Sequence, residues 1–134
     1  MRELEEKYLI FIDGRIAEHN NMSEQYKADD RKDEADLEKI KVNIYEIFRT
    51  LFLSDIKQLE GKDLGQLGDI NIYGGFLIHF DTIPANWKIS LAKAIEHGDI
   101  TKQVIEEHKL EVAKELKDRF LTIFDEHTRG QCDD

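Results

Sequence analysis

LEKIKVNIYEIFRTLFLSDI, residues 37–56, is the stretch that decides the fold of this chain. Its apolar residues recur at spacings of three and four, the period of an amphipathic α-helix. Tyr45, Phe52 and Ile56 lie roughly 90° to 130° around that helix from the centre of the main apolar stripe. A helix with so wide an apolar surface has to be covered on more than one side. The main stripe consists of Leu37, Ile40, Ile44, Ile47, Phe48 and Leu51.

Other segments of the chain have the same periodicity, so the sequence predicts an all-α fold. Helices are expected at about residues 2–29, 34–60, 84–97 and 100–127. Three of them would each be roughly 40 Å long at 1.5 Å per residue, and matched lengths favour an antiparallel helical bundle of three long helices and one short one. We expect one domain over residues 1–129 and a polar C-terminal tail over residues 130–134.

Proline and glycine mark the ends of the short helix. Pro84, the sole proline of the chain, suits a first helical turn. Gly98 is expected to end this helix, and Asp99 to cap the next one. The buried face of the short helix is expected to comprise Trp87, Leu91, Ala94 and Ile95.

The segment INIYGGFLIHF, residues 70–80, contains few charges and is divided by Gly74-Gly75. Two glycines between runs of β-branched and aromatic residues are typical of a small β-hairpin. The alternative is the start of a helix, because Phe76, His79 and Phe80 are spaced by three and four. Either structure has to pack its apolar side chains against the bundle or against a second copy of the chain.

The charge of the chain argues against a nucleic-acid partner. With 29 acidic and 19 basic residues, the formal net charge is −10, and no window holds a basic cluster. Binding to phosphate groups needs clustered Lys and Arg, so neither nucleic acid nor an anionic membrane surface is an expected partner.

The chain also lacks the sequence features of secreted and membrane proteins, and we expect a cytoplasmic location. Its start, MRELEEKY, does not have the layout of a signal peptide. No apolar run approaches the roughly 20 residues that span a bilayer. The single cysteine, Cys132, can form neither an intramolecular disulfide nor a thiolate cluster for zinc. No cofactor is expected.

Histidines on helix faces are the first candidates for a metal site. His19 lies in the apolar stripe of the first helix, His108 at the edge of the stripe of the last helix, and Asp55 near the core-facing line of the second helix. If the first two helices form a hairpin that bends near residue 30, His19 and Asp55 would be roughly 20 Å apart along the bundle. We therefore do not expect these three residues to form one site.

An acidic row on the last helix offers a second candidate for metal binding. Its carboxylates are spaced by three and four residues and can hold Mg²⁺ or Mn²⁺, which would suit a metal-dependent phosphoester or nucleotide hydrolase. The other interpretation is a solvated face, in which Lys114 and Lys117 form local ion pairs with the row. The row consists of Glu107, Glu111, Glu115 and Asp118.

The function that we expect from the sequence is that of a non-enzymatic interaction or assembly module that forms a homo-oligomer or binds another protein. The wide apolar face of the second helix and the apolar segment 70–80 favour it, because such surfaces mark interfaces. The alternative is that the same side chains complete the core of a monomer. Aromatic residues contribute most to interfaces, and the candidate anchors are Tyr45, Phe52, Tyr73, Phe76, Phe80 and Trp87.

Overall fold

The structure is a computed structural model that describes residues 2–59 and 65–132, with side chains described for residues 3–58 and 73–129. This part of the chain is all-α and contains no strand, which confirms the predicted fold class. The helices are α1 (Arg2–Ala28), α2 (Lys32–Leu59), α3 (Gly65–Thr82), α4 (Ala85–His97) and α5 (Ile100–Cys132).

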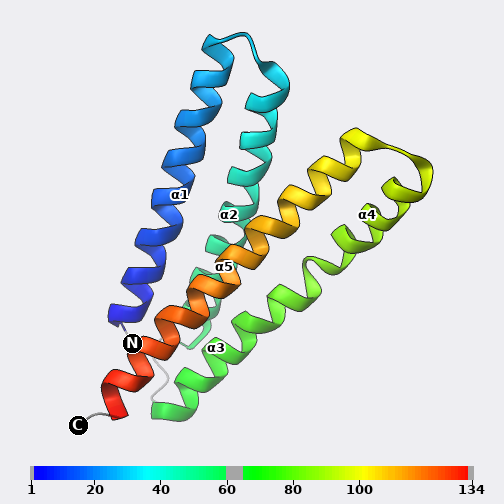
Figure 1. Cartoon of the computed structure of the whole chain (residues 1–134). Helices are drawn as coiled ribbons and strands as arrows, with labels where there is room; N and C mark the ends of the chain where they lie inside the picture. The colour runs from blue at the N-terminus through cyan, green and yellow to red at the C-terminus, as the bar shows by residue number, and fades with distance from the viewer. Residues whose placement is uncertain (1, 60–64, 133–134) are drawn as a thin grey trace.

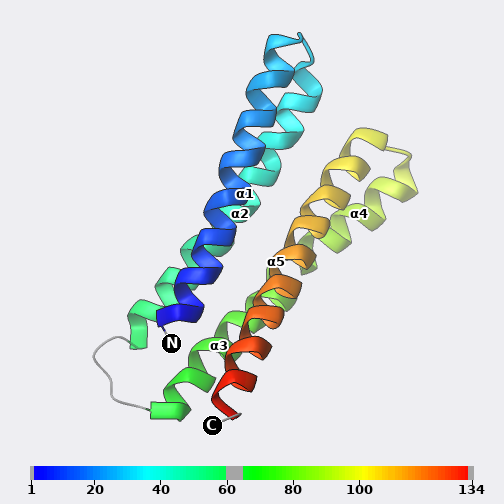
Figure 2. The ribbon, with the colours of Figure 1, turned by 60° about the vertical axis from the view of Figure 1, so that its left-hand side comes forward.

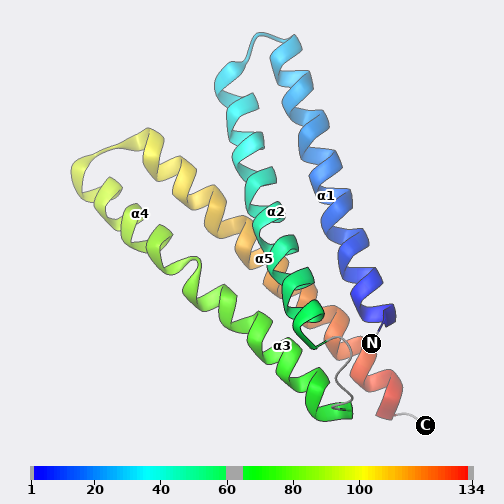
Figure 3. The ribbon, with the colours of Figure 1, turned by 180° about the vertical axis from the view of Figure 1, so that it is seen from behind.

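The helices form two long hairpins (Figure 1). One consists of α1 and α2, and the other consists of α5 and the bent pair of α3 and α4. The hairpins pack together near the two chain ends and separate toward their turns, as Figure 2 and Figure 3 show from two other sides. The hairpins contact each other mainly where α1 and α2 pack against α5 and where α2 packs against α3.

At the separated ends, one turn joins α1 to α2 and another joins α4 to α5. Asp30 adopts a left-handed φ of 61° after α1, and the Arg31 N–H donates to the Tyr26 carbonyl at 2.8 Å. Gly98 has a φ of 69°, which favours glycine, and the Asp99 carboxylate accepts a hydrogen bond from the Lys102 N–H at 3.1 Å. The predicted helix stop at Gly98 and N-cap at Asp99 are therefore confirmed.

Aromatic rings form the centre of the core. The ring of Tyr8 on α1 lies 5.0 Å from Phe52, 5.8 Å from Phe76 and 5.2 Å from Phe120, in edge-to-face geometry. These four side chains are almost completely buried, and the Tyr8 hydroxyl donates to the Leu116 carbonyl at 2.9 Å. Each such ring pair stabilises the fold by about 0.5–1.5 kcal/mol beyond the area it buries. Since the four rings come from four helices, the two hairpins share one core.

The predicted β-hairpin at residues 70–80 is wrong, because these residues lie within helix α3. Tyr73, Phe76 and Phe80 share one face of α3 and are buried, whereas Gly74 is exposed and Gly75 half-buried. Burial of three aromatic side chains outweighs the low helix propensity of the two glycines, which is about 1 kcal/mol each. The alternative helical interpretation of this segment is confirmed, and it extends back to Gly65.

The α3–α4 bend lies at Ile83 and Pro84. The Ile83 N–H still donates to the His79 carbonyl, but Pro84 has no N–H and starts the next helical segment. On α4, Ala94 is buried and Trp87 and Leu91 are half-buried, as predicted. Ile95, which the sequence placed on the same buried face, is 56% exposed. It follows Ala94 directly and points about 100° around α4 from it, outside the side that packs against α5.

The last helix is longer than predicted, since α5 continues to Cys132 rather than ending near residue 127. Residues 130–132, which the sequence placed in a polar tail, are part of this helix. Among the described residues, no helix is both long and apolar enough to cross a membrane.

Candidate functional site

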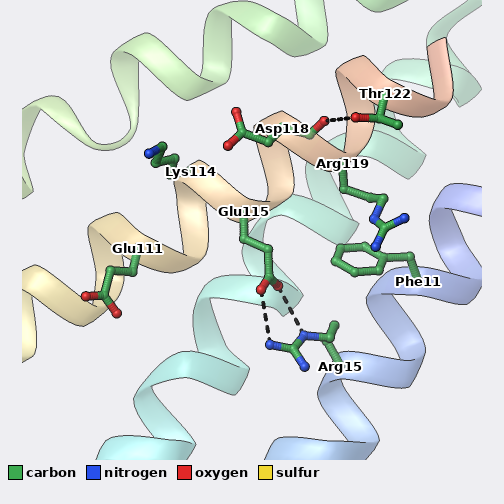
Figure 4. Close-up of a pocket in the computed structure, with 8 residues that line it drawn as sticks. All are labelled: Phe11, Arg15, Glu111, Lys114, Glu115, Asp118, Arg119 and Thr122. Carbon is green, nitrogen blue, oxygen red and sulfur yellow. Dashed lines mark hydrogen bonds and ion pairs between the residues drawn. The ribbon is translucent and has the colours of Figure 1, made fainter. Parts of the chain in front are cut away.

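A groove of about 860 Å³ lies between α1 and α5 (Figure 4). Three of the four acidic residues predicted as metal ligands line it, so it is the natural place to test the metal-binding alternative. The lining consists of Phe11, Arg15, Glu111, Lys114, Glu115, Asp118, Arg119 and Thr122.

Glu115 is bound by two other helices. Arg15 of α1 donates from Nε to Oε1 and from Nη2 to Oε2, each at 3.1 Å, as Figure 4 shows. The Tyr45 hydroxyl of α2 donates to Oε1 at 2.6 Å. Burial lowers the pKa of Arg15, but the hydrogen bonds to Glu115 and Tyr45 outweigh it and raise the pKa above its ordinary value. Glu115 therefore ties α1, α2 and α5 together, and its carboxylate is paired with the guanidinium of Arg15.

The remaining carboxylates do not converge on Glu115. Glu107 accepts a hydrogen bond from the Gln103 amide at 3.2 Å. Glu111 and Asp118 are exposed, and in Figure 4 their carboxylates point away from that of Glu115. Within the described residues, no group of three or more His, Cys, Asp or Glu side chains is arranged to hold a metal ion. The acidic row thus has the features of a charged helix face.

A layer of polar side chains continues from Glu115 toward the α1–α2 turn. His19 Nδ1 lies 2.5 Å from Glu38 Oε2, and both side chains are more than nine-tenths buried. Lys41 Nζ lies 3.3 Å from the other oxygen of Glu38, and the His19 ring stacks on Tyr45 at 5.5 Å. His19 Nε2 is buried and has no hydrogen-bond partner among the described residues. The layer joins the halves of α1 and α2 that lie nearer the α1–α2 turn. The imidazole of His19 is closed off from solvent.

His79 and His108 bind other groups and do not join the His19–Glu38 pair. His79 Nε2 on α3 lies 3.1 Å from Asp55 Oδ2 on α2, and His108 Nδ1 lies 2.8 Å from the Val104 carbonyl. His19, Asp55 and His108 are therefore engaged separately. The Asp55–His79 pair instead fastens α3 to α2 beside the aromatic core.

Five of the six predicted interface anchors lie in the core of the single chain. Phe52 and Phe76 are completely buried, with ring centroids 5.0 Å apart. The same holds for the whole group, whose exposed fractions are 6% or less: Tyr45, Phe52, Tyr73, Phe76 and Phe80. Side chains this deeply buried are not accessible to a second chain. Their positions fit the alternative that they complete the core of one chain.

Trp87, the sixth predicted anchor, is half-buried against the core. Lys109 Nζ lies over its ring at 5.8 Å and also lies 3.2 Å from Glu106. The indole therefore packs between α4 and α5, with only part of its surface open to solvent.

The exposed apolar residues of the second hairpin were not singled out from the sequence. Each of four isoleucines is more than half exposed, and together they span residues 78–100. Helical periodicity through α3 would have separated Ile78 from the buried Phe76 and Phe80, but that required treating 65–82 as a helix. Ile95 was expected on the buried face of the short helix instead. The four are Ile78 (57% exposed), Ile89 (56%), Ile95 (56%) and Ile100 (68%).

Comparison with known proteins gives no match: no family model, curated protein or solved structure is significantly similar to this chain.

Proposed function

We propose that this protein is an interaction module that self-associates through the outer surface of α3 and α4. The observation that carries the proposal is the presence of four isoleucines on residues 78–100, each more than half exposed. We refer to residues 78–100 as the isoleucine segment. Exposed apolar residues gathered on one part of a surface are typical of protein–protein interfaces.

The positions of the isoleucines on the helices support a common surface. The inner side of α4 is occupied by contacts to α5, where Ala94 is buried. At 100° per residue, Ile78 lies opposite the buried Phe76 and Phe80 on α3, and Ile89 lies about 140° from the buried Ala94 on α4, so both point away from the core. Ile95 and Ile100 are exposed nearer the α4–α5 turn.

The local charge favours a second copy of the chain as the partner. The isoleucine segment contains three acidic residues, Asp81, Glu96 and Asp99, and two basic residues, Lys88 and Lys93, so its formal charge is −1. Nearly all of the formal net charge of −10 therefore falls on the rest of the chain. Two identical acidic chains repel each other least when their nearly neutral surfaces meet. A two-fold dimer has this property, because it places the same surface on both subunits.

Sedimentation velocity over a range of protein concentrations tests the proposal. We expect wild type to dimerise, and the double variant Ile89→Glu/Ile95→Glu to remain monomeric with unchanged helicity. The matched control is Ile10→Glu, since Ile10 on α1 is 72% exposed and lies outside the isoleucine segment. If wild type stayed monomeric at about 100 μM, a concentration well above the dissociation constant expected for a specific interface, the proposal would be refuted. So would a double variant that dimerises as well as wild type.

Salt provides a second readout. Because both copies are acidic and the proposed contact is apolar, raising the NaCl concentration should strengthen association by screening repulsion. An interface held by ion pairs would respond in the opposite direction.

A further inference from the structure

A second groove, of about 320 Å³, lies where α3 bends into α4 and both pack against α5. Phe80, Pro84 and Leu110 form apolar parts of its lining. Phe80 is stacked on Phe48 at 4.7 Å within the core, so this wall is fixed in place. Pockets for small molecules usually measure about 300–1,000 Å³. The groove therefore suits a small ligand with a compact apolar group.

Three lysines from two helices line the same groove: Lys88 of α4, and Lys114 and Lys117 of α5. In the part of the chain that the structure describes, these three lysines take part in none of the ion pairs. Other lysines of this acidic protein do pair with glutamates, namely Lys7, Lys27, Lys41 and Lys109. Other described lysines, such as Lys93 and Lys102, also form no ion pair, so the feature that distinguishes this groove is that three such lysines line it together.

The electrostatic balance of the groove is positive. Asp81 also lines it, but one carboxylate is outnumbered by three ammonium groups. The start of α4 lies at the groove as well, where Pro84 makes no side-chain capping bond and the first turn has no acidic residue. The partial positive charge of a helix N-terminus adds to that of the lysines.

We infer that this groove binds a small phosphate monoester that carries an apolar group. A phosphate monoester has a charge of about −1.5 to −2 at pH 7, which suits several ammonium groups better than a single carboxylate does. Ammonium groups act as point charges and do not demand the planar geometry that a guanidinium selects. The apolar group of the ester would contact Phe80, Pro84 and Leu110. The groove is formed within one chain, so the inference does not depend on self-association.

The test is an NMR titration of the ¹⁵N-labelled full chain with phenyl phosphate at low salt. We expect saturable shifts of the amides of Phe80, Lys88 and Lys114, with a dissociation constant on the order of 1 mM for so small a ligand. Inorganic phosphate and phenol, each lacking half of the ligand, should bind at least about tenfold more weakly, a difference of about 1.4 kcal/mol. An absence of saturation up to about 20 mM would overturn the inference. Equal binding of inorganic phosphate would overturn the role of the apolar wall.

Charge-matched variants separate the groove from a general effect of net charge. Lys114→Gln/Lys117→Gln should weaken binding about tenfold or more, a loss of at least about 1.4 kcal/mol. The control Lys93→Gln/Lys102→Gln removes the same charge from exposed positions that do not line the groove, and should leave binding within about twofold of wild type. Lys88 is exposed, so Lys88→Gln tests the same groove without disturbing the packing of α5. Equal weakening by the control would overturn the assignment to this groove.

Discussion

Replacing Gly74 and Gly75 by alanine tests the helical structure of α3, which is the main departure from the sequence prediction. Both residues lie inside α3, and neither has a positive φ. A Cβ added at either position meets no atom within 4 Å. In a helix, each substitution should therefore stabilise the protein. In a two-residue hairpin turn, where both positions need a positive φ, each would destabilise it.

The expected magnitude follows from helix propensity. Alanine is favoured over glycine by about 0.8–1.0 kcal/mol per residue in a helix interior, so Gly74→Ala/Gly75→Ala should gain roughly 1.5–2 kcal/mol. The unfolding entropy is about 2.1 cal/mol/K per residue, or roughly 0.28 kcal/mol/K for 134 residues. The midpoint of thermal unfolding should therefore rise by about 6 °C.

Thermal unfolding followed by circular dichroism measures this shift, and two further glycines calibrate it. Gly14 lies within α1, and a Cβ there also meets no atom within 4 Å, so Gly14→Ala should raise the midpoint by about 3 °C. Gly98 has a φ of 69°, so Gly98→Ala should lower it. If the double variant at 74 and 75 lowered the midpoint while Gly14→Ala raised it, α3 would not be a helix.

Three other predictions concern the core and the polar layer. Phe76→Ala should lower the free energy of unfolding by about 3–5 kcal/mol, because Phe76 is completely buried. Urea unfolding at a protein concentration where the chain is monomeric measures this change. A loss below about 1 kcal/mol would show that Phe76 is not a core residue. Burial raises the pKa of Tyr8 and of Tyr45 above the ordinary value of 10.0, and for Tyr45 the hydrogen bond to Glu115 raises it further. As pH rises, the unfolded chain therefore loses its tyrosine hydroxyl protons before the folded chain does. The contribution of these two tyrosines to stability should be constant below pH 10. Above pH 10 it should fall by up to about 1.4 kcal/mol per pH unit for each tyrosine. Urea unfolding between pH 9 and 11 checks this, and Tyr8→Phe should make the decline shallower; an unchanged slope would contradict the role of Tyr8. Glu115→Gln should lower the free energy of unfolding by about 1 kcal/mol, because Arg15 and Tyr45 lose a charged acceptor, and a variant as stable as wild type would show that this contact does not fasten the hairpins.

Much of the fold could be predicted because helical periodicity is a local property. The expected helices at 2–29, 34–60 and 84–97 differ from α1, α2 and α4 by at most two residues at any end. The turn at Gly98 and Asp99 was equally predictable, because their backbone and capping preferences act within a few residues. Helix α3 was not, since its glycines favour a turn locally and only the packing of Phe76 on Phe52 and Phe120 makes the helix favourable.

The candidate sites depended more on tertiary structure. The acidic row on α5 was visible in the sequence, but the pairing of Glu115 with Arg15 joins residues 100 positions apart. Likewise, the sequence placed Lys114 and Lys117 as ion-pair partners of the acidic row, whereas in the structure both line the groove beside the α3–α4 bend. Long-range pairing of this kind has no signature in local spacing.

By itself, the sequence determined that this protein is all-α, where most of its helices lie and that its surface is acidic. Only the tertiary structure decided that the aromatic residues of α2 and α3 form one core, that isoleucines of α3 and α4 remain exposed, and that three lysines surround one groove. The physical reason is that helix formation depends on neighbours within a few residues, whereas burial depends on which helix faces meet. Helix α4 lies at the outer edge of the molecule, and no other helix in the described part of the chain covers its outer side. Ile89 and Ile95 are therefore exposed to solvent, although their apolar side chains would suit a core.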